Sequence, residues 1–147
     1  MITITRLGEP VPFARTRIAK TGTLFTPDRQ RSAMAELRIL AWQEMAAQHG
    51  GRMLDEPLRL EMLAEFSIPA RWSNRQRQRA IIGEILPAKR PDIDNLFKLA
   101  ADALNQIVYR DDALIVEARI RKRYSLSPKI VLTIAPVNAE AAAGGGL

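Results

Sequence analysis

Four side chains in the second half of the sequence have the types and spacing for metal-dependent chemistry on a phosphate. Asp92 and Asp94 are two residues apart, Lys98 follows one helical turn later, and Asp112 stands at a turn further on. Residues two apart in an extended chain project to the same side, and Lys98 shares a helical face with Asp94. Carboxylates that hold a divalent cation bind phosphate through it and activate a water, while an ammonium stabilises the developing charge. The pattern therefore indicates phosphodiester hydrolysis.

The same residues also have an ordinary structural interpretation. Asp94 is a good helix N-cap, and Asp94 with Lys98 is a common helix pair that contributes only roughly 0.3 kcal/mol. Asp111 and Asp112 together are typical of a turn. Spacing alone therefore leaves both a catalytic and a structural role open.

Composition limits the kinds of site that the chain can build. Its 147 residues suit one domain, and they include no cysteine and one histidine, His49. Disulfides, thiolate catalysis and metal sites made of cysteine or several histidines are thereby excluded, so a metal must be held by oxygen, which favours Mg²⁺ or Mn²⁺. The 22 basic residues against 16 acidic ones give a net charge of +6, which favours a polyanionic partner such as nucleic acid.

The beginning of the sequence bears on location. Residues 1–5 alternate like a strand rather than forming an apolar leader, and no stretch is long and apolar enough to cross a bilayer. We therefore expect a cytoplasmic protein with no membrane partner.

Hydrophobic periodicity and capping residues predict the elements that position these side chains. The predicted strands are residues 1–7, 58–68, 114–120 and 129–134. The predicted helices are residues 27–48, with Thr26 as N-cap and Pro27 in the first helical position, a short helix capped by Ser73, and residues 94–105. This order predicts an α/β fold, a single domain with a mixed β-sheet and helices packed on it.

Apolar spacing also predicts which faces are buried. Trp42, within the first helix, is expected in the core. The other predicted buried residues are Met34, Leu37, Ala41 and Met45 in the first helix, Ile93, Phe97, Ala100 and Leu104 in the last helix, and Leu114, Val116, Ala118 and Ile120 in the strand after Asp112.

The acidic segment resembles the motif of the RusA family of Holliday-junction resolvases. Three stretches carry the resemblance, in the order in which that family has them: Pro91-Asp92-Ile93-Asp94-Asn95-Leu96-Phe97-Lys98, Asp102-Ala103-Leu104-Asn105, and Asp111-Asp112-Ala113. The resemblance implies a RusA-like nuclease domain over residues 1–136. Residues 137–147 form an Ala/Gly tail with no core-forming pattern, which we expect to be disordered.

Roles for individual residues follow from the resemblance. It implies that Asp92, Asp94 and Asp112 are metal ligands and that Lys98 is the active-site lysine, so that these four residues are catalytic. It further implies a homodimer that resolves four-way DNA junctions by paired nicks with Mg²⁺, or alternatively Mn²⁺, in DNA recombination and repair. Many members of the family are encoded by phages or prophages.

Three basic segments are candidates for DNA contact. The first is the loop after the first strand and the second is a one-signed basic run that leads into the acidic motif. The third is an exposed strand face with Arg119, Arg121 and Arg123, for which DNA contact and a solvated face are equally open. The predicted DNA-binding residues are Arg15, Arg17 and Lys20 in the loop, Arg71, Arg75, Arg77 and Arg79 in the run, and Lys89 and Arg90 just before the acidic motif. A charge run is more often a solvated face, and that alternative stays open. Trp72, within the basic run, is expected to be a packing anchor rather than a wedge between bases.

Two other classes of function compete with a nuclease. A non-catalytic DNA-binding protein of the same fold, such as a recombination accessory or regulatory factor, would bind junctions without cleaving them. An enzyme acting on a small phosphorylated molecule ranks last, because no glycine-rich phosphate-binding loop is present.

Overall fold

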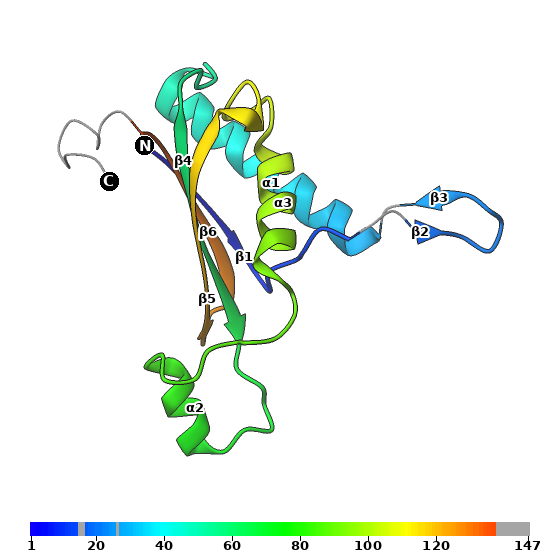
Figure 1. Ribbon diagram of the computed structural model, residues 1–147, viewed down its shortest axis with the longest axis vertical. Coiled ribbons are helices and arrows are strands. Elements are labelled where there is room, and N and C mark those ends of the chain that lie inside the picture. The colour runs from blue at the N-terminus through cyan, green and yellow to red at the C-terminus, as the bar shows by residue number, and fades with distance from the viewer. Residues whose placement is uncertain (15–16, 26, 138–147) are drawn as a thin grey trace.

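A four-stranded mixed sheet, in the order β1-β6-β4-β5, organises the molecule (Figure 1). The computed structural model describes residues 1–14, 17–25 and 27–137. The strands of the sheet are β1 (Ile2–Leu7), β4 (Leu58–Ser67), β5 (Ile115–Ser125) and β6 (Lys129–Pro136). β6 pairs antiparallel with both β1 and β4, whereas β4 and β5 are parallel, so β5 is an edge strand. A separate antiparallel hairpin of β2 (Arg17–Ile18) and β3 (Leu24–Phe25) extends away from the sheet (Figure 1).

Two helices cover one face of this sheet. They are α1 (Asp28–His49) and α3 (Ile93–Leu104), which pack against each other as well as on the strands. The short α2 (Asn74–Ile81) lies beyond the ends of β4 and β5, and a single 3₁₀ turn, η1 (Asp112–Leu114), precedes β5 (Figure 1). The expected α/β domain with a mixed sheet is confirmed. No helix within the described residues is both long and apolar enough to cross a membrane.

The core lies between the sheet and the two helices. In β4, every second side chain from Leu58 to Phe66 is buried, as the alternation predicts. From α1 the expected Leu37, Ala41 and Met45 are buried, together with Ala33. Met34 is only half-buried.

The ends of α1 differ slightly from the expectation. Pro27 is the N-cap residue, so Asp28 rather than Pro27 is the first helical residue. Thr26, the predicted cap, lies outside the described residues. At the other end Gly50 adopts the left-handed conformation, φ 61°, and donates its N–H to the Met45 carbonyl, as a helix-terminating glycine does.

The predicted short helix is confirmed with its cap. The Ser73 Oγ accepts from the Gln76 N–H at 3.2 Å, and the Gln76 Oε1 accepts from the Ser73 N–H at 3.1 Å, which is a capping box. Trp72 packs edge-on against Tyr124 of β5 with ring centroids 5.2 Å apart. Trp72 is therefore a packing anchor between the loop before α2 and the sheet.

Three expectations about burial are wrong, each for a non-local reason. The buried face of α3 contains Leu96, Leu99 and Ala103 beside Ala100 and Leu104, whereas Ile93 is exposed and Phe97 half-buried. Two overlapping apolar stripes run along this helix, and its packing against the sheet selects the one through Leu96.

The other two errors concern exposed residues. Val116 is 64% exposed and Ala118 is exposed as well, because β5 is an edge strand that the helices cover only in part. Leu114 lies in η1 rather than in the strand. Trp42 is also 64% exposed, since it lies on the side of α1 that faces away from the sheet.

Candidate active site along helix α3

The N-terminal end of α3 carries the first two carboxylates. Asp92 is the N-cap residue, in an extended conformation, and its side chain makes no capping hydrogen bond. Asp94 is the second residue of the helix, and both side chains are exposed. The two carboxylates are therefore available to a ligand, and they lie where the partial positive charge of a helix end stabilises anions.

Lys98 stands one turn further along the same helix. Its Nζ lies 3.5 Å from the Asp102 Oδ2 and 4.8 Å from the centre of the Phe13 ring. The Phe13 N–H in turn donates to the Asn95 carbonyl at 2.9 Å, which ties the segment after β1 to α3. The expected alignment of Lys98 and Asp102 on one helix face is confirmed, and Phe13 is a neighbour that the sequence did not indicate.

The third carboxylate lies nearer the other end of α3. The Asp111 side chain accepts from the Ala113 N–H at 3.0 Å, and this hydrogen bond holds the pKa of Asp111 below its usual value. The pKa of Asp112 is raised, first by its hydrogen bond with Asp111, and also by desolvation and by the Asp102 carboxylate. Lys98 opposes that rise. Negative charge is thus crowded around Asp112, a condition that a bound cation would relieve.

The C-terminal carbonyls of α3 are individually satisfied, which fixes the turn that carries Asp112. The Tyr109 hydroxyl donates to the Ala101 carbonyl at 2.6 Å, and Arg38 of α1 donates to the Ala103 carbonyl at 3.0 Å. The backbone N–H groups of residues 105, 107 and 108 donate to the Asp102 and Leu104 carbonyls. These contacts close the helix end that would otherwise leave acceptors unpaired, and none of them was anticipated from the sequence.

The three predicted ligands therefore form two groups. Asp92 and Asp94 stand at the start of α3, and Asp112 lies beside Asp102. Asp102 is eight positions beyond Asp94 in the helix, about 12 Å along the axis. Among the described residues, no three acidic or histidine side chains converge closely enough to hold a metal ion. The donor chemistry, exposed carboxylate oxygens only, fits Mg²⁺ or Mn²⁺. Lys98 lies between the two groups.

The basic residues flank this helix from two sides. Lys89 and Arg90 are exposed and line a hollow of about 630 Å³ together with Asp92 and Arg29. Arg29 belongs to the first turn of α1, where a cation is disfavoured unless an anion binds nearby. The hollow thus combines one candidate ligand with three cations.

The arginines of the basic run around α2 differ in whether they have a partner. Arg77 donates to the Pro69 carbonyl and Arg79 pairs with Glu84 at 2.9 Å. Within the described part of the chain, the side chains of Arg71 and Arg75 are exposed and make no hydrogen bond or ion pair. Arg71 and Arg75 are therefore the members of the run that are free to meet a phosphate.

The basic segment after β1 is described only in part. Lys20 is exposed at the turn of the β2–β3 hairpin. Arg17 lies in β2, but its side chain lies outside what the structure describes, and Arg15 lies outside the described residues altogether.

Comparison with known proteins agrees with the motif. The model of the family described as endodeoxyribonuclease RusA matches residues 8–135, so the chain belongs to the RusA family of endodeoxyribonucleases. The chain is also similar to YqaN of Bacillus subtilis (strain 168), which is described as an uncharacterized protein. The two are 29% identical over 142 residues, which cover 94% of this chain and 98% of that protein. The resemblance in the acidic segment is confirmed at the level of the family, and membership supports a nuclease.

Proposed function

We propose that this protein is a magnesium-dependent endonuclease that resolves Holliday junctions by paired nicks. One observation carries the proposal. The chain belongs to an endodeoxyribonuclease family, and its α3 begins with two exposed carboxylates, Asp92 and Asp94. Lys98, one turn later, lies near the carboxylates of Asp102 and Asp112.

Asp92, Asp94 and Asp112 are the residues that would hold the metal. When bound, Mg²⁺ or Mn²⁺ supplies a Lewis acid for the phosphate and a water of lowered pKa. Binding of one ion by both carboxylate groups would require movement of side chains or of the turn at residues 110–112. The ion's charge would favour the ionised form of Asp112, whose pKa is raised by its hydrogen bond with Asp111, by desolvation and by the neighbouring carboxylates.

The chain's own cations have separate tasks in this proposal. Lys98 offers positive charge to the non-bridging oxygens of the scissile phosphate. Arg71, Arg75, Lys89 and Arg90 neutralise backbone phosphates of the flanking arms and release counterions. Arg15, Arg17 and Lys20 would extend that path along the hairpin, and Arg77 and Arg79 would orient α2 within it.

A four-way junction has two-fold symmetry, and symmetrical nicks need two active sites. A homodimer provides them through one isologous interface, so we propose that the protein acts as a dimer. We also propose a cytoplasmic role in DNA recombination and repair, in a cell or in a phage that infects it.

An end-labelled synthetic four-way junction, with a linear duplex of the same sequence beside it, tests the proposal. We expect symmetrical nicks in the junction alone, and only with Mg²⁺ or Mn²⁺. Asp94→Asn should abolish cleavage while binding stays equal or becomes tighter, because one negative charge near the phosphate is gone. Glu56→Gln, which removes an exposed carboxylate in the loop before β4, is the matched control and should cleave normally.

The competing function predicts a different result. A non-catalytic junction-binding protein would retard the four-way junction on a gel and leave it uncut with either metal. That outcome would replace the nuclease proposal by the binding one.

A further inference from the structure

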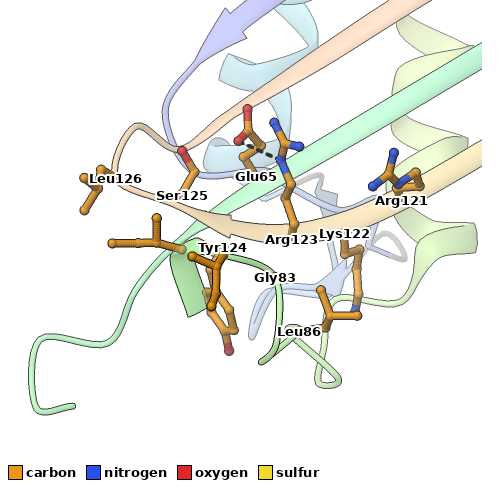
Figure 2. A pocket seen from close by; sticks show the side chains of 11 residues that line it. Glu65, Gly83, Leu86, Arg121, Lys122, Arg123, Tyr124, Ser125 and Leu126 are labelled. Atoms are coloured by element: carbon orange, nitrogen blue, oxygen red, sulfur yellow. Dashed lines mark hydrogen bonds and ion pairs between the residues drawn. The ribbon is translucent and has the colours of Figure 1, made fainter. Parts of the chain in front are cut away.

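Lys122 of β5 points away from its two arginine neighbours. Successive side chains of a strand alternate between its faces, and Figure 2 shows Arg121 and Arg123 on one side of β5 and Lys122 with Tyr124 on the other. Arg123 pairs with the buried Glu65 of β4 at 3.0 Å, on the face of the sheet opposite α1 and α3. Lys122 is therefore directed to the face on which α3 and the segment before it lie.

The Lys122 ammonium is bound to the backbone of the segment that leads into Asp92. Its Nζ donates to the Lys89 carbonyl at 2.6 Å and to the Pro91 carbonyl at 2.9 Å. An ammonium has three N–H donors, so two of its three hydrogen bonds are made to this one stretch of chain. The contact joins residues more than thirty positions apart in sequence.

Apart from the two bonds from Lys122, residues 89–91 make no hydrogen bond with any described residue, although Pro91 is half-buried. Within the described chain no backbone hydrogen bond joins residues 89–91 to a strand or a helix; the nearest are Ala88 N–H to the Leu86 carbonyl and, after the segment, Leu96 N–H to the Asp92 carbonyl. Pro91 has no N–H to donate. Because Pro91 immediately precedes Asp92, the position of its carbonyl determines how the Asp92 side chain leaves the helix end.

β5 is connected to both carboxylate groups. It begins directly after η1, whose first residue is Asp112, and it reaches the Asp92 segment through Lys122. A rigid strand that is paired along its length with β4 thus sets the spacing of the two groups.

We propose that Lys122 is a positioning residue for Asp92, holding the 89–91 backbone so that the Asp92 carboxylate is oriented to bind the metal. The proposal rests on the function proposed above for Asp92. Its physical content is that two hydrogen bonds from a charged donor fix a loop that the sheet does not fix. In metal sites, loss of such an outer contact weakens metal binding by roughly 10–100-fold.

Three variants separate this role from general loss of charge. Lys122→Met keeps the apolar stem and removes the donors. Lys122→Arg keeps a charged group that donates to two acceptors. Arg121→Met removes one positive charge from the adjacent residue, whose side chain points to the opposite face (Figure 2).

The first readout needs no metal and no DNA. In hydrogen–deuterium exchange of the metal-free protein, we expect the peptide covering residues 88–95 to exchange faster in Lys122→Met than in the wild type. Arg121→Met should leave that peptide unchanged, and Lys122→Arg should restore much of its protection. Equal exchange in the wild type and Lys122→Met would overturn the proposal, whatever the enzyme's activity.

The second readout is the Mg²⁺ concentration that gives half the maximal cleavage rate of the four-way junction. It should rise by about tenfold or more in Lys122→Met, recover in Lys122→Arg and stay near the wild-type value in Arg121→Met. Junction affinity in EDTA should change by no more than the loss of one charge, as in Arg121→Met. Faster exchange with an unaltered Mg²⁺ requirement would make Lys122 a brace of the loop only and would refute its link to the metal.

Failure of the proposed function would give a different experimental result. If the wild-type protein neither cleaves with Mg²⁺ or Mn²⁺ nor gains thermal stability from them, the metal site itself is wrong. The exchange result then still decides whether Lys122 orders residues 89–91.

Discussion

Tyr109→Phe removes one buried hydroxyl that closes the C-terminal end of α3. Tyr109 is fully buried, and its hydroxyl donates to the Ala101 carbonyl at 2.6 Å. Burial, with the nearby Asp112 and Asp102 carboxylates, raises the pKa of Tyr109, so the hydroxyl remains a donor across the usable pH range. The substitution changes no apolar contact of the ring.

The expected cost follows from the acceptor that is left behind. Ala101 is itself only 3% exposed. Among the described residues, no backbone N–H that follows α3 donates to the Ala101 carbonyl. A buried acceptor without a partner costs about 1–3 kcal/mol, more than the net value of about 1 kcal/mol for an average hydrogen bond. For a domain of this size each kcal/mol lowers Tm by roughly 2–4 °C, so we expect a fall of about 2–12 °C.

Tyr124→Phe is the matched control. Tyr124 is also buried, at 5% exposure, but its hydroxyl makes no hydrogen bond with any described residue and points away from the sheet (Figure 2). Urea denaturation of both variants at pH 7 should show a loss for Tyr109→Phe and little change for Tyr124→Phe. Equal midpoints for the two variants would refute the account of the helix end, because both lose the same atom.

Three further predictions concern other elements. Ser73→Ala removes the capping box of α2 and should cost about 1 kcal/mol in urea denaturation, with faster amide exchange confined to α2; protection that stays unchanged there would contradict the role of the cap. Asp112→Asn should raise Tm at pH 7 in EDTA and lose that advantage near pH 3, because a carboxyl whose folded pKa is raised costs stability once it ionises; a lower Tm at pH 7 would contradict the crowding of charge. Asp111→Asn is the control for Asp112→Asn: because the folded pKa of Asp111 is lowered, this variant should not raise Tm at pH 7. Arg75→Ala should weaken junction binding and reduce the slope of log affinity against log salt by about 1, and an unchanged slope would exclude a phosphate contact.

Features that depend only on neighbours along the chain could be predicted from the sequence. The alternation of β4 and the Ser73–Gln76 capping box are local patterns, and both are present as predicted. The Asp92-x-Asp94 motif with Lys98 is local as well. It was sufficient to indicate the RusA family, to which the chain belongs.

Other features required the tertiary structure, because they depend on which elements become neighbours. α3 has two overlapping apolar stripes, and only its packing on the sheet selected the one through Leu96 and Leu99. Val116 is exposed although its strand alternates, since the strand order makes β5 an edge. No periodicity encodes strand order, which is a property of long-range pairing.

The candidate site also combines features that could be predicted from the sequence with features that depend on the fold. The residue types along α3 could be predicted from the sequence. The position of Asp112 beside Asp102, away from Asp94, depends on where η1 meets the helix. The contacts of Lys122 with residues 89 and 91 join distant segments through backbone carbonyls, which every residue possesses and no motif can mark. Side-chain chemistry is therefore determined by the sequence, whereas the backbone groups that it meets are decided only when the chain folds.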